Sequence, residues 1–105
     1  MIGVLALQGD YEKHIHILDL LKIQNMEIRY SRELDMIQGL VIPGGESTTM
    51  TDLMGRNGFY EPIRNFAKNY PILGTCAGLI MMASSVPGSR VEPLGILDIE
   101  VDRNA

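Results

Sequence analysis

Residues 2–10 read Ile-Gly-Val-Leu-Ala-Leu-Gln-Gly-Asp, an apolar run that ends in a polar turn. A continuous apolar run is typical of a strand that is buried on both faces, as in a parallel sheet covered by helices. The next stretch, from Tyr11 to about Gln24, is amphipathic, and Asp10 stands before it as a preferred N-cap residue. We therefore expect a helix there, with a buried face that carries Ile17, Leu18, Leu20 and Leu21.

The rest of the chain continues the alternation of strands and helices. We expect strands at residues 26–30, 39–42, 70–73 and 96–101, and helices from Thr48 or Thr49 to Met54, at 60–68 and at 79–83. This order is typical of an α/β fold, an open parallel sheet with helices on both faces. Because no helix follows the last strand to cover that part of the sheet, we expect the 105 residues to be a partial domain.

Composition and charge argue against several classes of function. The 105 residues are 46% hydrophobic and 21% charged, which is ordinary for one globular domain. The formal net charge of -4 and the lack of a basic run argue against nucleic acid or an acidic membrane as partner. The longest apolar run, residues 79–83, is far shorter than the roughly 20 residues of a membrane span, so we expect a cytoplasmic protein.

The single cysteine, Cys76, is the first candidate for chemistry. It cannot form an internal disulfide, and no Cys/His spacing resembles a metal site, so we expect no metal. It lies in residues 74–78, Gly-Thr-Cys-Ala-Gly, between a predicted strand and a predicted helix. This pattern matches a nucleophile elbow, whose glycines allow a sharp turn that holds the middle residue above the sheet. A lone cysteine is usually buried packing, but the flanking glycines, the preceding strand and the separate Pro-Gly-Gly turn favour a nucleophile here. The expected helix N-terminus would favour its thiolate form.

Three turns follow predicted strands, at residues 8–9, 43–47 and 74–78. Because the carboxyl ends of parallel strands share one edge of a sheet, we expect these turns to converge there. The backbone N–H of Ala77, directly after the nucleophile, is the expected first donor of an oxyanion hole, and the Gly44–Gly45 turn can supply the second. On its own, a Pro-Gly-Gly sequence is more often a plain turn, so its role here depends on the elbow.

These segments resemble the triad (class I) glutamine amidotransferases, and more closely the glutaminase subunits of pyridoxal 5'-phosphate synthase. The matching segments are residues 3–9, 14–15, 43–50, 74–80 and 101–104. The resemblance implies a three-layer, flavodoxin-like open parallel sheet and the hydrolysis of L-glutamine to glutamate and ammonia through a thioester on the cysteine. It implies no bound cofactor. The ammonia would pass to the synthase subunit, which builds pyridoxal 5'-phosphate (vitamin B6), in a hetero-oligomeric complex.

The same resemblance implies a role for individual residues. Cys76 would be the nucleophile, Gly45 and Ala77 would form the oxyanion hole, and the glutamine site would consist of Gly45, Glu46, Ser47 and Arg103. A guanidinium fork suits the α-carboxylate of glutamine because it can bind both oxygens. Without the resemblance, an arginine at this position is an ordinary surface charge.

The sequence departs from the family in one large respect. Family members supply a His and a Glu two residues apart from a late strand and turn, whereas the only histidines here, His14 and His16, lie in the first predicted helix. We expect His14 to point inward as a structural residue and His16 to be solvated. Residues 1–105 are therefore expected to be the N-terminal part of a single glutaminase domain, almost inactive alone.

Two other interpretations of the sequence remain open. One is a cysteine protease or deglycase of the same fold, although that branch usually has an acidic residue where this chain has Gln8-Gly9. The other is a degenerate, non-catalytic module that binds the synthase.

Overall fold

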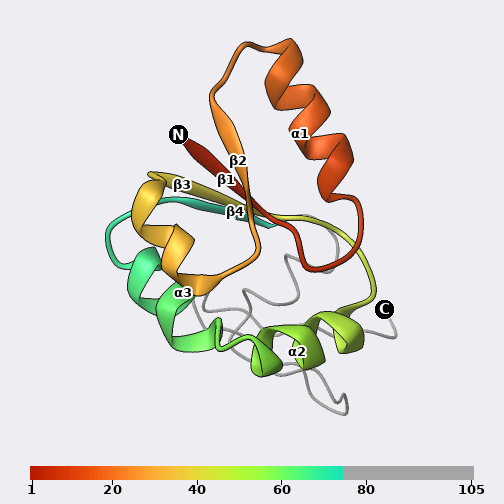
Figure 1. Ribbon diagram of the computed structural model, residues 1–105, viewed down its shortest axis with the longest axis vertical. Coiled ribbons are helices and arrows are strands. Elements are labelled where there is room, and N and C mark those ends of the chain that lie inside the picture. Colours follow the sequence, from red (N-terminus) through yellow and green to blue (C-terminus); the bar gives the residue numbers. More distant parts are fainter. Residues whose placement is uncertain (75–105) are drawn as a thin grey trace.

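The computed structural model describes residues 1–74, which form a parallel sheet with helices on both sides (Figure 1). The four strands lie in the order β2-β1-β3-β4. Their bounds are Ile2–Leu5 for β1, Asn25–Ile28 for β2, Gly39–Ile42 for β3 and Ile72–Gly74 for β4. The strands predicted at 26–30, 39–42 and 70–73 are confirmed, and their observed ends agree with the prediction within about two residues. The predicted helix at 79–83 and strand at 96–101 lie outside the described residues.

Helices connect these strands across both faces of the sheet. The first is α1, Tyr11–Leu20, and it lies on one side, whereas α2, Ser47–Arg56, and α3, Tyr60–Ala67, lie on the other (Figure 1). A 3-10 helix that the sequence pattern does not predict, η1 at Ser31–Met36, joins β2 to β3. The result is the expected α/β architecture, in which a helix layer, the sheet and a second helix layer follow one another.

The hydrophobic core lies between the sheet and the layer of α2 and α3. Strand side chains meet helix side chains there, and burial of this apolar area is the main favourable contribution to folding. The strands contribute Leu5, Ile28, Leu40 and Ile42, and the other layer contributes Leu34, Met50, Met54, Phe59, Ile63 and Phe66. Phe59 is the largest of the side chains that are completely shielded from solvent.

Helix α1 differs from its prediction in the face that it buries. Four half-buried residues at helical spacing lie toward the sheet, namely Tyr11, His14, Ile15 and Leu18. In contrast, Ile17, Leu20 and Leu21 are 52%, 69% and 64% exposed. The prediction is confirmed for Leu18 and wrong for the other three residues, because the helix carries two apolar faces and sequence spacing alone did not show which one the sheet covers.

Helix α1 also ends earlier than expected, at Leu20 instead of about Gln24. Lys22 has a positive φ of 58°, and the backbone N–H groups of Lys22 and Ile23 donate to the carbonyls of Asp19 and Leu18 at 3.0 and 2.9 Å. This pair of bonds is a Schellman motif, which usually has glycine at the left-handed position. Because lysine occupies that position here, no residue type marks the helix end in the sequence.

Candidate functional site

The strand order creates a topological switch point, the expected position of a ligand crevice, at the carboxyl ends of β1 and β3, which lie side by side in parallel register with Val4 opposite Val41. After β1 the chain turns toward α1, on one side of the sheet, and after β3 it turns toward α2, on the other (Figure 1). The two connections therefore diverge. In open α/β sheets, ligands bind at such a point, where neighbouring strands send their connections to opposite faces.

Three of the predicted site residues lie at this crevice, directly after β3. Gly45 and Glu46 follow the strand, and Ser47 is the first residue of α2. Strand β4 ends at Gly74, which pairs with Ile42, so β3 and β4 reach the same edge of the sheet together. Cys76, Ala77 and Arg103 lie outside the described residues, and their assigned roles stay predictions.

The turn after β1 contacts the turn after β3 directly. The side-chain amide of Gln8 donates from Nε2 to the carbonyl oxygen of Glu46 at 3.3 Å and accepts at Oε1 from the Glu46 N–H at 3.4 Å. The N–H of Asp10 donates to the carbonyl oxygen of Gly44 at 3.1 Å. The predicted convergence of these two turns is confirmed, although the sequence pattern assigns no role to the Gln8 side chain.

Gly9 permits this close approach of the two turns. Its φ is +83°, a backbone conformation that side chains disfavour. A Cβ atom built on Gly9 would overlap the carbonyl oxygen of Gly44, which is backbone and cannot rotate away. Glycine is therefore required at this position by both conformation and space.

The contact from Asp10 also orients the peptide between Gly44 and Gly45. In a trans peptide the C=O and N–H groups point in opposite directions. Because the Gly44 carbonyl points at the Asp10 N–H, the Gly45 N–H points away from the turn after β1. Among residues 1–74, no hydrogen-bond acceptor is recorded for this N–H. The geometry is that of a donor available to a bound molecule.

The Glu46 carboxylate caps helix α2. It accepts hydrogen bonds from the N–H of Thr49 at 2.7 Å, from the N–H of Thr48 at 3.2 Å and from the hydroxyl groups of both threonines. The Thr48 hydroxyl bond contributes most, followed by the two N–H bonds, and together they lower the pKa of Glu46 to about 2. The expected cap at Thr48 or Thr49 was wrong: the acceptor is Glu46, directly before the helix, and the threonines are donors.

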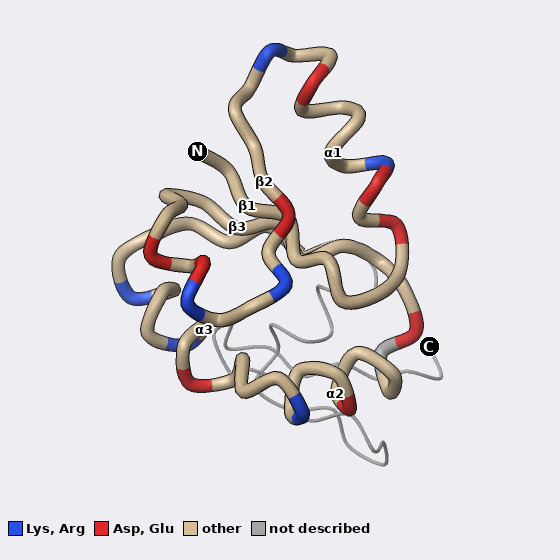
Figure 2. The backbone as a smooth tube through the Cα atoms, viewed as in Figure 1, with Lys and Arg blue, Asp and Glu red and all other residues tan. Residues whose placement is uncertain are grey.

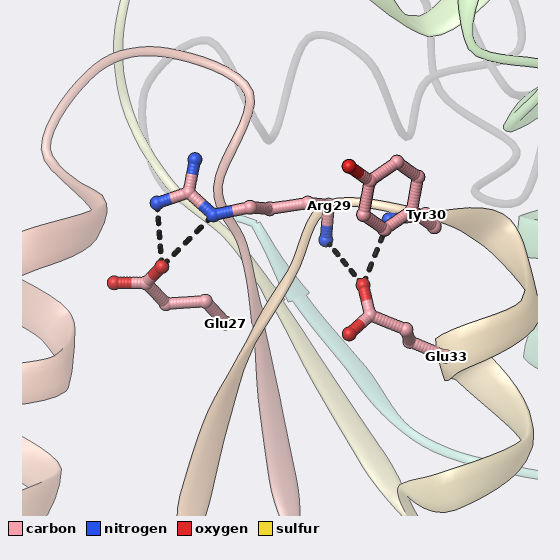
Figure 3. Close-up of polar contacts among 4 residues, drawn as sticks. All are labelled: Glu27, Arg29, Tyr30 and Glu33. Carbon is pink, nitrogen blue, oxygen red and sulfur yellow. Dashed lines mark hydrogen bonds and ion pairs between the residues drawn. The ribbon is translucent and has the colours of Figure 1, made fainter.

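The carboxyl end of β2 is held by a second set of charged groups (Figure 3). One oxygen of Glu33 accepts from the N–H groups of Arg29 and Tyr30 at 2.9 and 2.8 Å, and these bonds lower the pKa of Glu33. The Arg29 guanidinium binds Glu27 at 2.5 and 3.0 Å and lies 5.8 Å from the ring centre of Tyr11. This arginine is therefore engaged with the first residue of α1 and with Glu27 of the preceding strand β2.

Charge and cavities elsewhere in the described part add little to the site. Basic and acidic residues are interspersed along the tube through residues 1–74, without a run of one sign on any element (Figure 2). A cavity of about 540 Å³ lies between η1 and α3, and its lining includes none of the described site residues Gly45, Glu46 and Ser47. Within residues 1–74, no group of three His, Cys, Asp or Glu side chains could hold a metal ion. None of the described helices is long and apolar enough to cross a membrane.

The sequence resembles one protein family and several curated relatives. It matches the SNO glutamine amidotransferase family over residues 4–105. It is 51% identical to pyridoxal 5'-phosphate synthase subunit PdxT of Dehalococcoides mccartyi, a match that covers 99% of this chain and 55% of the relative. For the protein of the same name in Desulforamulus reducens, the identity is 49%, with 100% of this chain and 56% of the relative covered. The chain spans about half the length of the curated relatives it matches.

The fold was compared with solved structures. A crystal structure of a glutamine amidotransferase superposes with a TM-score of 0.91 at 38% sequence identity, over 99% of this chain and 57% of that chain. The α/β architecture expected from the sequence is thus that of a glutamine amidotransferase of known structure.

Proposed function

Because this chain belongs to the SNO glutamine amidotransferase family, we propose that the full-length protein hydrolyses L-glutamine to L-glutamate and ammonia, with Cys76 as nucleophile. We further propose that it works in the cytoplasm beside a pyridoxal 5'-phosphate synthase, which receives the ammonia. The names of the relatives in Dehalococcoides and Desulforamulus support this partner.

Each predicted residue has one task in this reaction. The Cys76 thiolate attacks the γ-carboxamide carbon of glutamine, and the carbonyl electrons move to oxygen. The N–H groups of Gly45 and Ala77 bind the oxyanion that forms. When the intermediate collapses, the C–N bond breaks and the nitrogen leaves as ammonia after it takes a proton. Water then cleaves the γ-glutamyl thioester, which releases glutamate and restores the thiolate.

The substrate is held by the remaining predicted residues. The turn of Gly45, Glu46 and Ser47 would bind glutamine at the carboxyl end of β3, and Arg103 would bind its α-carboxylate. Because the Glu46 carboxylate already accepts bonds from Thr48 and Thr49, this turn would meet glutamine mainly through its backbone. No metal or bound cofactor takes part in the proposal.

The proton transfers need a histidine base, and residues 1–74 place no histidine at the crevice. His16 is exposed on α1, and His14 is half-buried on the face of α1 that lies toward the sheet. A helix moves away from the strand ends by about 5 Å a turn, so neither imidazole is well placed to serve a thiol above the sheet. In our proposal the His and Glu of the triad lie outside residues 1–105, which form the N-terminal part of the glutaminase domain.

The observation that supports this function most directly is the geometry at Gly45. Its N–H stands at the carboxyl end of β3, is turned away from the first turn, and has no recorded acceptor among residues 1–74. Removal of one oxyanion donor typically costs about 100- to 1,000-fold in rate. A fixed donor of this kind would therefore account for a large part of the rate enhancement of amide hydrolysis.

The test is glutamate release by the full-length protein mixed with its synthase, compared with a Cys76→Ala variant and a His16→Asn control. We expect the alanine variant to lose on the order of 1,000-fold or more in kcat. We expect the control to stay within about twofold because its side chain is exposed. A γ-glutamyl adduct on the peptide that contains Cys76, seen by mass spectrometry, would identify the intermediate.

Other outcomes would refute the proposal. If the wild-type complex leaves glutamine intact but consumes glyoxal adducts, the deglycase interpretation is correct. If the protein binds the synthase and releases no ammonia, it is a non-catalytic module. Undiminished glutamate release by Cys76→Ala would remove the cysteine from the mechanism.

A further inference from the structure

The side chain of Gln8 is bound to the backbone of a single residue on the far side of the crevice. Its amide donates to the carbonyl of Glu46 at 3.3 Å and accepts from the N–H of the same residue at 3.4 Å. Gln8 and Glu46 are 38 positions apart in the sequence. Gln8 is half-buried, so its amide is partly shielded from water.

The same side chain fills the space beside Gly45. A Cβ atom on Gly45 would overlap the amide group of Gln8. The Gly44–Gly45 peptide is thus held on both sides: the Asp10 N–H binds the Gly44 carbonyl, and Gln8 binds the residue that follows Gly45.

We propose that Gln8 is a positioning residue, whose amide holds the turn of residues 44–46 so that the Gly45 N–H faces the oxyanion. This inference rests on the proposed function, because it assigns to Gln8 the orientation of a donor in that reaction. Gln8 touches neither the glutamine nor the thiol in this proposal; it acts through Gly45.

The chemistry of the amide explains why glutamine suits this position. A primary amide both donates and accepts, whereas a carboxylate only accepts and a thioether does neither well. Glutamate would keep the bond from the Glu46 N–H and lose the bond to the Glu46 carbonyl. Methionine has a similar length and would fill the space while it loses both bonds. The two substitutions therefore remove one bond or both without opening a cavity.

The expected effect is partial because Asp10 still holds the Gly44 carbonyl. Complete loss of an oxyanion donor costs about 100- to 1,000-fold, and displacement of a reacting group by 1 Å costs on the order of 100-fold. We therefore expect kcat for glutamine to fall about 10- to 100-fold in both Gln8→Met and Gln8→Glu, since the glutamate carboxylate would face the Glu46 carbonyl oxygen.

The experiment compares these variants with Gln38→Met in the full-length protein with its synthase. Gln38 is a matched control, since its side chain is exposed and accepts a hydrogen bond from the N-terminal amine at 3.0 Å, away from the crevice. Two reactions of Cys76 are measured. Glutamine hydrolysis forms an oxyanion, whereas alkylation by iodoacetamide does not. A positioning role predicts slower hydrolysis and an alkylation rate within about twofold of wild type.

A second measurement does not depend on the reaction. Amide hydrogen exchange at Glu46 reports directly on its bond to Gln8. We expect about fivefold faster exchange in Gln8→Met, and no change in Gln38→Met. Unchanged exchange at Glu46 would overturn the proposal whether or not the protein is a glutaminase.

The remaining outcomes separate this proposal from the proposed function. If wild type releases no glutamate, the proposed function fails, while faster exchange at Glu46 would still support Gln8 as the residue that holds the turn. If wild type is active and Gln8→Met hydrolyses glutamine at the wild-type rate, the inference about Gln8 is wrong and the proposed function stands. An equal loss of hydrolysis and alkylation would show a general disturbance of Cys76, which also contradicts the proposal.

Discussion

Replacement of Gly9 by alanine should destabilise the protein by about 2–4 kcal/mol. The left-handed φ of +83° costs an alanine about 1–2 kcal/mol relative to glycine. The new Cβ also overlaps the Gly44 carbonyl oxygen, so the two turns must separate. That separation breaks the bond from the Asp10 N–H to Gly44, which is worth about 0.5–1.5 kcal/mol. The remaining cost comes from the weakened contact of Gln8 with Glu46.

Two other glycines provide matched controls for the two parts of this cost. Gly58 has a φ of +64°, and a Cβ atom added there would have nothing within 4 Å, so Gly58→Ala should cost only the conformational part, about 1 kcal/mol. Gly55 lies inside α2 with open space around it and no positive φ. Gly55→Ala should therefore stabilise the protein, by about 0.5–1 kcal/mol.

The assay is urea unfolding monitored by circular dichroism. The free energies of unfolding of the variants are compared with one shared value for their dependence on urea concentration. The expected order of stability is Gly55→Ala, wild type, Gly58→Ala and then Gly9→Ala. A Gly9→Ala variant that loses no more than Gly58→Ala would refute the reasoning, because the two turns would then tolerate a methyl group between them. Glutaminase activity of the same variant should fall as well, since the Gly44–Gly45 peptide loses its fixed orientation.

Three further predictions concern a charge, a helix end and the core. The lowered pKa of Glu46, about 2, means that its ionised cap stabilises the fold above about pH 4.5 and loses this effect as the pH falls toward 2. The stability difference between wild type and Glu46→Gln, from urea unfolding at a series of pH values, should therefore shrink below about pH 4.5; a difference independent of pH would contradict this. Lys22→Gly should raise the free energy of unfolding by about 0.5–1 kcal/mol, since glycine adopts the positive φ at the end of α1 without strain; a loss of stability in urea would count against the Schellman assignment. Phe59→Ala should cost about 3–5 kcal/mol in thermal or urea unfolding because the ring is completely buried, and a cost below about 1 kcal/mol would show that the core is packed differently.

The strands could be predicted from the sequence because parallel strands buried on both faces appear as plain apolar runs. Residues 39–42 are the clearest case, since Gln38 precedes the run and Pro43-Gly44-Gly45 follows it, and β3 spans the same four residues. The position of the expected crevice could also be predicted, because turns that follow parallel strands lie together at the carboxyl edge of the sheet.

The parts that could not be predicted depend on contacts distant in sequence or on residues that act against their preferences. The sequence around Gln8 does not show that its amide will form hydrogen bonds with Glu46, because these bonds require β1 and β3 to be neighbours in the observed register. The end of α1 was missed because Lys22 takes a conformation that usually signals glycine. The cap of α2 was misplaced because threonine is the commoner N-cap residue, while here a glutamate one position before the helix accepts the bonds.

The long-range bond between Gln8 and Glu46 also has a consequence for the order in which the protein assembles. The Glu46 cap joins residues two and three positions apart and can form as soon as that segment leaves the ribosome. The contact of Gln8 with Glu46 instead closes a loop of 38 positions, which costs chain entropy that the pairing of β1 with β3 and the burial of the core must offset. When only the segments of β1 and α1 have left the ribosome, Glu46 has not yet been translated. The Gln8 amide of such a nascent chain is therefore hydrated and makes no contact across the site.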